Sequence, residues 1–267
     1  MLIRVDDIHF AYPGGVKALD GISFTIQPGE KVALVGENGS GKTTLARHLN
    51  GLLHPQAGGV WIGEWQTTQH TPAKLARHVA YVFQNPDEQL FRQRVWDEVA
   101  FGPKNLGYTP EQVRIMVEQT LDKMDLSGLS QLNPRDLGYS GRKRVALASA
   151  LTMQTPVLVF DEPTVGLDAK ELDQLGKVIT SYHQQGKTIL IILHDMDFLA
   201  ENMDRFILLN QGLVALDAPS QQFFKQKMLL ETSGLVAPQI TRLSQSLRYS
   251  HLAMCVDQFL MFGRRER

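Results

Sequence analysis

The fold of this chain is decided by the stretch Lys31-Val32-Ala33-Leu34-Val35-Gly36-Glu37-Asn38-Gly39-Ser40-Gly41-Lys42-Thr43. Its first five residues form a short apolar run of the kind that makes a buried β-strand. A glycine-rich loop follows at once, and the residues from Lys42 to about Leu52 have helical character. Gly36–Thr43 matches the P-loop pattern, in which backbone N–H groups encircle phosphate oxygens at a helix N-terminus. The stretch therefore predicts a site for the phosphates of a nucleotide.

The residues of this loop have individual expected roles. The glycines let backbone N–H groups approach the phosphate oxygens closely. Lys42 would reach the β- and γ-phosphates, and Thr43 would ligate Mg²⁺. A chance glycine-rich turn is the alternative, but the strand before the loop and the helix after it argue against that interpretation. The residues expected to bind nucleotide here are Gly36, Glu37, Asn38, Gly39, Ser40, Gly41, Lys42, Thr43 and Thr44.

A second apolar strand ends in two acidic residues. Val157–Phe160 is followed directly by Asp161 and Glu162. In P-loop enzymes a strand-end aspartate holds Mg²⁺, directly or through water, so we expect Asp161 to do so. Glu162 would point to the opposite side of an extended chain and polarise an attacking water as general base. A solvated strand end is the alternative, and the nearby P-loop makes it the weaker one.

Away from these segments, strands and helices alternate along the chain. The first 30 residues are β-rich, whereas about 86–150 is mainly helical. The pattern predicts an α/β fold built on a mainly parallel sheet, with a helical insertion in the middle. We expect one domain over 1–219 and a weakly patterned extension over 220–267.

Capping and turn signals mark several element ends. Thr109-Pro110-Glu111-Gln112 is a helix start, with Thr as N-cap and Pro at the first position. Asp168 with Glu171 opens another helix, which Gly186 closes. Residues 206–216 are predicted to form a late hairpin.

Composition excludes several classes of protein. Of 267 residues, 43% are hydrophobic and 21% charged, and the net charge is −1. These values are typical of a globular protein and give no indication of general affinity for nucleic acid. Cys255 is the single cysteine, so no intrachain disulfide can form, which fits a reducing cytosol. The N-terminus does not resemble a signal peptide, and no apolar run reaches the roughly 18 residues of a membrane span.

Several motifs together resemble the ATP-binding-cassette (ABC) ATPases over roughly the first 220 residues. The resemblance implies an N-terminal antiparallel β subdomain, and ATP and Mg²⁺ as ligands. It implies adenine stacking by Tyr12, a Q-loop at Gln84, and a switch histidine at His194 that contacts the γ-phosphate. Asp161–Thr164 resembles the Walker B motif, and Asp168 ends a D-loop. Taken singly, each residue has a plain structural alternative; their joint order favours function.

A narrower resemblance is to the ATPases of energy-coupling-factor transporters, which import vitamins, cobalt or nickel. It rests on Gln84–Phe91 and Asp97–Gly107, and on Glu231–Leu243 in the tail, where that group carries an extension that helps ATPase subunits dimerise. The resemblance implies membrane subunits whose arginine-bearing coupling helices dock near the Q-loop. These helices are expected to meet an acidic docking surface formed by Asp87, Glu88, Asp97 and Glu98. The alternative is that the four residues form an ordinary solvated cluster.

The signature motif departs from the family pattern Leu-Ser-Gly-Gly-Gln. A gap-free alignment places Gly138 on the serine that meets the γ-phosphate, and Gly141 on the glutamine. Tyr139 and Ser140 then replace two glycines. A two-residue deletion would instead put Ser140-Gly141 on the Ser-Gly of the family. Because family members form head-to-tail dimers, Gly138, Ser140 and Gly141 would face ATP held by a partner subunit.

The resulting hypothesis is an ATP-hydrolysing subunit at the cytoplasmic face of a membrane, paired with a second ATPase subunit and with membrane subunits. We expect catalysis from Glu162, His194, Lys42 and Gln84, and Mg²⁺ held by Thr43, Gln84 and Asp161. The alternative is a nucleotide-binding partner with poor hydrolysis that completes a heterodimer. A cassette ATPase acting on DNA or ribosomes is disfavoured, because there is no long coiled-coil insertion, second cassette or basic stripe. The solute stays open.

Overall fold

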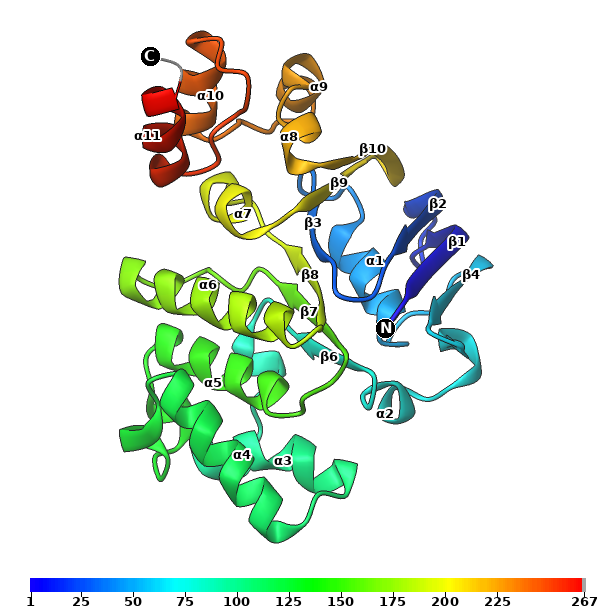
Figure 1. Ribbon diagram of the computed structural model, residues 1–267. Coiled ribbons are helices and arrows are strands. Elements are labelled where there is room, and N and C mark those ends of the chain that lie inside the picture. Colours follow the sequence, from blue (N-terminus) through cyan, green and yellow to red (C-terminus); the bar gives the residue numbers. More distant parts are fainter. Residues whose placement is uncertain (266–267) are drawn as a thin grey trace.

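The computed structural model describes residues 1–265 and centres on a six-stranded sheet (Figure 1). Its strand order is β10-β9-β3-β8-β7-β6. Five strands are parallel, and β10 pairs antiparallel with β9. The bounds are β3 Lys31–Val35, β6 Val79–Val82, β7 Val157–Asp161, β8 Thr188–Ile192, β9 Arg205–Asn210 and β10 Leu213–Pro219. The carboxyl ends of β3, β6, β7 and β8 therefore meet at one edge, where open α/β sheets bind ligands.

A second, antiparallel sheet forms the N-terminal part. It contains β1 (Ile3–Ala11), β2 (Lys17–Ile26), β4 (Ala57–Ile62) and β5 (Trp65–Gln66), in the order β2-β1-β4-β5. The first two strands agree with the β-rich start of the sequence. The β4 strand escaped the sequence pattern because Gly58 and Gly59 dilute its alternation.

The helices lie on both sides of the central sheet and at two ends of the molecule (Figure 1). Helices α3 to α5 form a helical layer at one end, and α8 to α11 cluster at the other. The bounds are α1 Lys42–Leu49, α2 Pro72–Leu75, α3 Val95–Leu106, α4 Pro110–Lys123, α5 Tyr139–Leu151, α6 Ala169–Gln184, α7 Met196–Asn202, α8 Ser220–Phe223, α9 Lys227–Thr232, α10 Gln239–Ser246 and α11 Val256–Arg265. The α/β architecture predicted from the sequence is confirmed.

The predicted helix caps agree with the structure, whereas the predicted end of one helix does not. Thr109 and Asp168 each form a complete capping box, at the starts of α4 and α6. Gly186 follows α6 with φ +77°. Helix α1 ends at Leu49, short of the expected Leu52, because Gly51 adopts φ +73° and turns the chain.

Strand β3 lies between two hydrophobic cores, which fixes the loop that follows it. Ala33 and Val35 belong to the core shared with the helical layer. Val32 and Leu34 belong to the core between the two sheets. Alternate side chains of one strand thus anchor both faces, so the glycine-rich loop starts from a rigid base.

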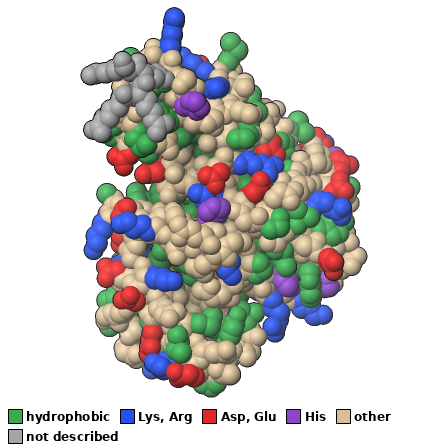
Figure 2. Space-filling model, viewed as in Figure 1, with side chains coloured by type: hydrophobic (Ala, Val, Ile, Leu, Met, Phe, Trp, Pro, Cys, Tyr) green, Lys and Arg blue, Asp and Glu red, His purple; other side chains and the backbone are tan. Residues whose placement is uncertain are grey.

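No helix within residues 1–265 is long and apolar enough to span a membrane. On the face shown in Figure 2, Lys and Arg side chains are interspersed with Asp and Glu rather than gathered into one stripe.

Candidate functional site

A cleft of about 540 Å³ opens at the carboxyl edge of the central sheet. It brings together segments far apart in the chain: the end of β1, the glycine-rich loop, and the ends of β6, β7 and β8. The predicted residues that line it are Tyr12, Asn38, Gly39, Gly41, Lys42, Thr43, Thr44, Gln84, Glu162 and His194. Val16, Lys17, Ala18, Val165 and Ile192 also line it and were not anticipated.

Backbone carbonyl groups of the glycine-rich loop hold Lys42 in place. Lys42 is 6% exposed, and its Nζ donates to the carbonyl oxygens of Gly36 and Glu37 at 2.8 Å each. Burial lowers the pKa of Lys42, while the charges of Glu162 and Asp161 oppose this. Tyr12 reaches the same loop, because its hydroxyl lies 3.0 Å from Thr44 Oγ1. The ring of Tyr12 thus borders the end of the cleft where a base could stack.

Three of the predicted loop residues support the loop and do not line the cleft. Gly36 packs against the carbonyl of Leu209. The exposed side chain of Glu37 lies against the backbone of Gly234, so the C-terminal extension touches the loop. Ser40 is buried, and its carbonyl accepts from Gly212 N–H at 3.2 Å.

Gly36→Ala is expected to destabilise the protein by at least about 2 kcal/mol, because a Cβ at φ +144° would lie 2.1 Å from Leu209 O. Gly39→Ala is the matched control: its φ is +81° but nothing lies within 4 Å, so only about 1 kcal/mol of backbone strain is expected. Urea unfolding of both variants checks this. Equal losses would show that Leu209 does not constrain the loop.

Asp161 is the buried carboxylate at the end of β7. It is 1% exposed; its Oδ1 accepts from Thr43 Oγ1 at 3.2 Å, and its Oδ2 accepts from the Tyr81 hydroxyl at 2.8 Å. Burial raises the pKa of Asp161, and the hydrogen bonds from Tyr81 and Thr43 act in the opposite direction. Burial and the charge of Asp161 raise the pKa of Tyr81 above its usual range, so the phenol keeps its proton.

The residues present fit a hard divalent cation. The hydroxyl of Thr43 and a carboxylate oxygen of Asp161 already meet, and both are oxygen ligands of the kind Mg²⁺ takes. The exposed Gln84 lines the same cleft and can add an amide oxygen.

The backbone conformation of Glu162 differs from the one predicted. The expected extended chain is wrong at this residue: β7 ends at Asp161, and Glu162 has φ +48°. The left-handed turn aims its carboxylate into the cleft, where Oε1 lies 3.3 Å from His194 Nε2. Burial and the charge of Asp161 raise the pKa of Glu162 to about 7, whereas burial and Lys42 lower that of His194. A carboxylate of this pKa suits a general base near neutral pH.

Glu162→Gln is expected to stabilise the nucleotide-free protein at pH 8, by on the order of 3 kcal/mol. The folded-state pKa of Glu162 lies above its ordinary value of 4.5, at about 7. Wild-type stability relative to the variant is therefore lost as pH rises from 4.5 through 7, because burying the ionised form is unfavourable. Chemical denaturation of both proteins at pH 5 and pH 8, in EDTA, measures the difference. A gain that is equal at the two pH values would contradict the raised pKa.

The predicted signature residues and Asp168 do not line this cleft, whereas Val165, at the start of the D-loop, does. Gly138 is the N-cap of α5, with φ −60° and ψ 167°. Ser140 lies inside α5, and its hydroxyl donates to Glu171 Oε1 at 2.5 Å. The ring of Tyr139 covers Gly166 of the D-loop. Asp168 caps α6, and Gly141 packs on Leu137. None of Gly138, Ser140, Gly141 and Asp168 can touch a nucleotide held in the cleft of the same chain.

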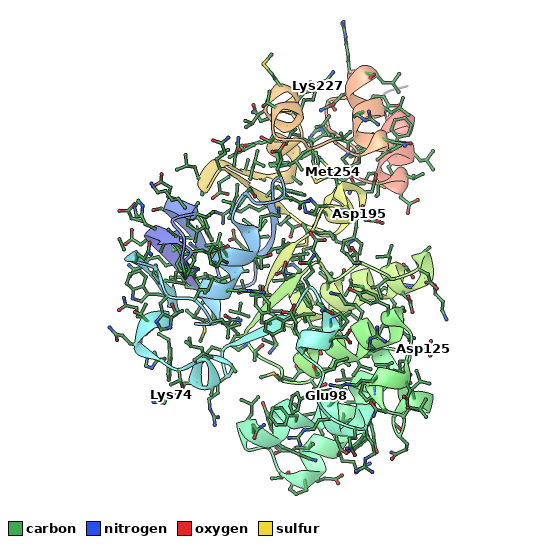
Figure 3. All side chains as sticks on the ribbon, turned by 180° about the vertical axis from the view of Figure 1, so that it is seen from behind. Lys74, Glu98, Asp125, Asp195, Lys227 and Met254 are labelled. Carbon is green, nitrogen blue, oxygen red and sulfur yellow. The ribbon has the colours of Figure 1, made fainter. Side chains whose placement is uncertain are left out.

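The prediction that Glu98 belongs to an acidic docking surface is wrong. That side chain is 2% exposed, and its Oε2 accepts from the backbone N–H groups of Phe91 and Arg92 (Figure 3). It stabilises the turn before α3, so its Oε2 is already engaged within the chain. Asp97 pairs with Arg94 at 2.7 Å.

The two remaining acidic residues stay accessible. Asp87 and Glu88 have side chains 56% and 55% exposed. Each already has an arginine of its own chain nearby, since Asp87 lies 3.0 Å from Arg142 and Glu88 lies 3.9 Å from Arg47. An incoming arginine would therefore compete with a neighbour or join it.

Sequence reasoning missed Lys143 and Tyr81. Lys143 is fully buried, and its Nζ donates to the carbonyls of Phe83 and Gln84 at 3.1 and 2.7 Å. Burial lowers its pKa to about 8. Helical spacing could have found it, because it shares a face with the buried Leu147. Tyr81 has the only polar side-chain group, a hydroxyl, in the otherwise apolar strand β6, and it lies three residues before Gln84.

The known proteins that resemble this chain include ABC transporter components. Residues 19–165 match the ABC transporter family. A putative ABC transporter ATP-binding protein of Caldanaerobacter subterraneus subsp. tengcongensis is 37% identical over 95% of this chain, which spans only 45% of that relative. The energy-coupling factor transporter ATP-binding protein EcfA of Methanothermobacter thermautotrophicus is 36% identical over 92% of this chain and 80% of the relative. CbiO1 of Clostridium perfringens, part of the ABC transporter complex CbiONQ, superimposes with a TM-score of 0.75 and 30% identity over 92% of this chain and 98% of its own.

Proposed function

From the premise that this chain belongs to the ABC transporter family of ATP-binding proteins, we propose that it is the ATP-hydrolysing subunit of an importer of the energy-coupling-factor type. One observation supports the hydrolytic role above the others. A single cleft holds a phosphate-binding lysine, a buried aspartate beside a threonine hydroxyl, and a glutamate of raised pKa beside a histidine. These are the parts that phosphoryl transfer to water requires.

In the proposed mechanism the chain positions ATP and activates water. Tyr12 stacks on adenine, and the loop 36–44 surrounds the phosphates. Thr43, Asp161 and Gln84 would hold Mg²⁺, which would supply charge neutralisation at the phosphates. Glu162 takes a proton from the attacking water, and His194 and Lys42 stabilise charge on the γ-phosphate.

A groove of about 240 Å³ next to the Q-loop is the proposed seat for a membrane subunit. Its wall includes Phe91 and Phe101, 55% and 36% exposed, whose rings pack edge to face at 4.8 Å. Exposed aromatic side chains of this kind anchor protein interfaces. Asp87 and Glu88 immediately precede Gln89, which also lines the groove, and supply the acidic part. This arrangement supports a peripheral subunit on the cytoplasmic face.

A second ATPase subunit completes the proposed assembly. The C-terminal extension supports this, because helices α9 to α11 and their links expose apolar side chains that a partner could cover. These are Met228, Val236, Leu243, Leu247, Val256, Leu260 and Met261. The signature region at the N-terminus of α5 would then face ATP of the partner.

The alternative function, a partner with poor hydrolysis, is favoured by one observation. The Ser140 hydroxyl, close to the start of α5, is engaged by Glu171 of its own chain. In a heterodimer the cleft with Glu162 would instead receive the signature of the other subunit.

Uptake measurements test the proposed function. Cells lacking this chain should lose uptake of radiolabelled cobalt, nickel or one vitamin from a panel. Wild-type protein should restore it, and the Glu162→Gln variant should not. Restoration by both would support the poor-hydrolysis alternative. Unchanged uptake of every solute on deletion would overturn the importer assignment.

A further inference from the structure

Tyr81 is the one side chain that touches both the Asp161 carboxylate and the groove next to the Q-loop, within the described part of the chain. It lies on β6, where its Cα pairs with Val159 of β7, two residues before Asp161. Its hydroxyl therefore reaches the carboxyl end of the neighbouring strand. The residue is 9% exposed, and its ring packs on Phe83 at 4.8 Å, so the phenol has little freedom to turn away.

The two oxygens of Asp161 have different partners. Oδ1 faces the Thr43 hydroxyl at 3.2 Å, which is a long and easily replaced hydrogen bond. Oδ2 accepts from Tyr81 at 2.8 Å, a normal and buried bond to a charged acceptor. A cation shared by Thr43 and Asp161 would engage Oδ1, while Oδ2 would stay held by the phenol.

We propose that Tyr81 is a positioning residue for the Mg²⁺ site, holding Oδ2 so that Oδ1 is presented beside Thr43. The inference rests on the proposed role of Asp161 as a metal ligand. Hydrogen bonds to metal-binding carboxylates orient them, and their removal typically costs about 10- to 100-fold in metal affinity or activity. Tyr81 does not line the nucleotide cleft, so its hydroxyl should not affect ATP binding without the metal.

Tyr81→Phe removes the hydroxyl and keeps the ring. Tyr182→Phe is the matched control: Tyr182 is 1% exposed, and its hydroxyl donates to Leu151 O at 3.2 Å, remote from the cleft. Both changes delete one buried hydroxyl and keep the ring; the Tyr182 hydroxyl also accepts from Gln154 Nε2 at 3.2 Å. Each is made in a Glu162→Gln background so that bound ATP is not consumed.

The experiment first measures the affinity for a fluorescent ATP analogue in EDTA. Mg²⁺ is then titrated into the protein with the analogue bound, and the change in fluorescence is followed. Tyr81→Phe should raise the Mg²⁺ concentration at half-effect about 10- to 100-fold, with the affinity in EDTA within about twofold of the background protein. Tyr182→Phe should change neither value. Superimposable Mg²⁺ curves for Tyr81→Phe and the background protein would overturn the proposal. If the background protein binds no nucleotide, or shows no Mg²⁺ effect, the proposed function itself fails.

Discussion

Glu162→Gln is expected to abolish Mg²⁺-ATP turnover by the purified chain while ATP still binds. The amide keeps the size of the side chain and its place beside His194, 3.3 Å away in the wild-type protein, but it cannot accept the proton of the attacking water. Loss of a positioned general base typically costs about 10²- to 10⁴-fold in rate. Lys42, Thr43 and the loop backbone are untouched, so the dissociation constant of ATP should stay within a few fold. Phosphate release and calorimetric titration measure the two quantities.

The wild-type protein decides how this result is interpreted. If steady turnover disappears in Glu162→Gln, the signature region at the start of α5 supports hydrolysis in a homodimer, although Gly138 replaces the serine of the family. Binding without turnover in the wild-type protein means that a second ATPase subunit must supply the signature. Turnover that survives in Glu162→Gln contradicts the assignment, and another group must then activate water.

Gly138→Ser is expected to raise turnover of the purified chain by about 100-fold. Gly138 stands at the N-cap of α5 with extended dihedral angles that serine adopts freely, and nothing lies within 4 Å of the position a Cβ would take. The new hydroxyl would point out from the helix start, toward ATP held by the partner copy. Removing a single hydrogen-bond donor to developing negative charge typically lowers kcat about 10²- to 10³-fold. We expect that adding one donor raises turnover by the lower of these two factors.

A matched variant separates this hydroxyl from helix capping. Gly138→Asp caps the helix about as well as serine, by a few tenths of a kcal/mol relative to glycine, but its carboxylate has no proton to donate. The gain should therefore be specific to Gly138→Ser and should vanish in the double variant with Glu162→Gln. An equal gain in Gly138→Asp would trace the effect to helix stability, and no gain in Gly138→Ser would count against the gap-free alignment.

Much of the fold follows from short, local signals. The strand 31–35, the glycine-rich loop and the helix after it are confirmed, because sterics and backbone hydrogen bonding fix such a unit within a few residues. The same holds for the capping boxes at Thr109 and Asp168. The resemblance to ATPases of energy-coupling-factor transporters is confirmed by the relatives. The individual roles of the site residues stay predictions.

The features that escaped prediction depend on tertiary surroundings. Glu162 turns into the cleft because β7 stops one residue earlier than an extended chain would require. Glu98 is charged and belongs to an acidic run, yet two backbone N–H groups bury it. Lys143 is a buried cation because two carbonyls of the Q-loop receive it. Helical spacing places Lys143 on the buried face of α5, but no spacing rule reveals in advance that the backbone N–H groups of Phe91 and Arg92 enclose Glu98.

If a membrane subunit docks in the groove that Tyr81 lines and Mg²⁺ binds at Asp161, the double contact of Tyr81 would couple the two binding equilibria. Its ring lines the groove proposed for the membrane subunit, and its hydroxyl holds Asp161. If a docked helix displaces the ring and weakens Mg²⁺ binding by some factor, Mg²⁺ must weaken docking by the same factor, since linkage is reciprocal. The strength with which the ATPase holds its transporter would then vary with the free magnesium of the cell.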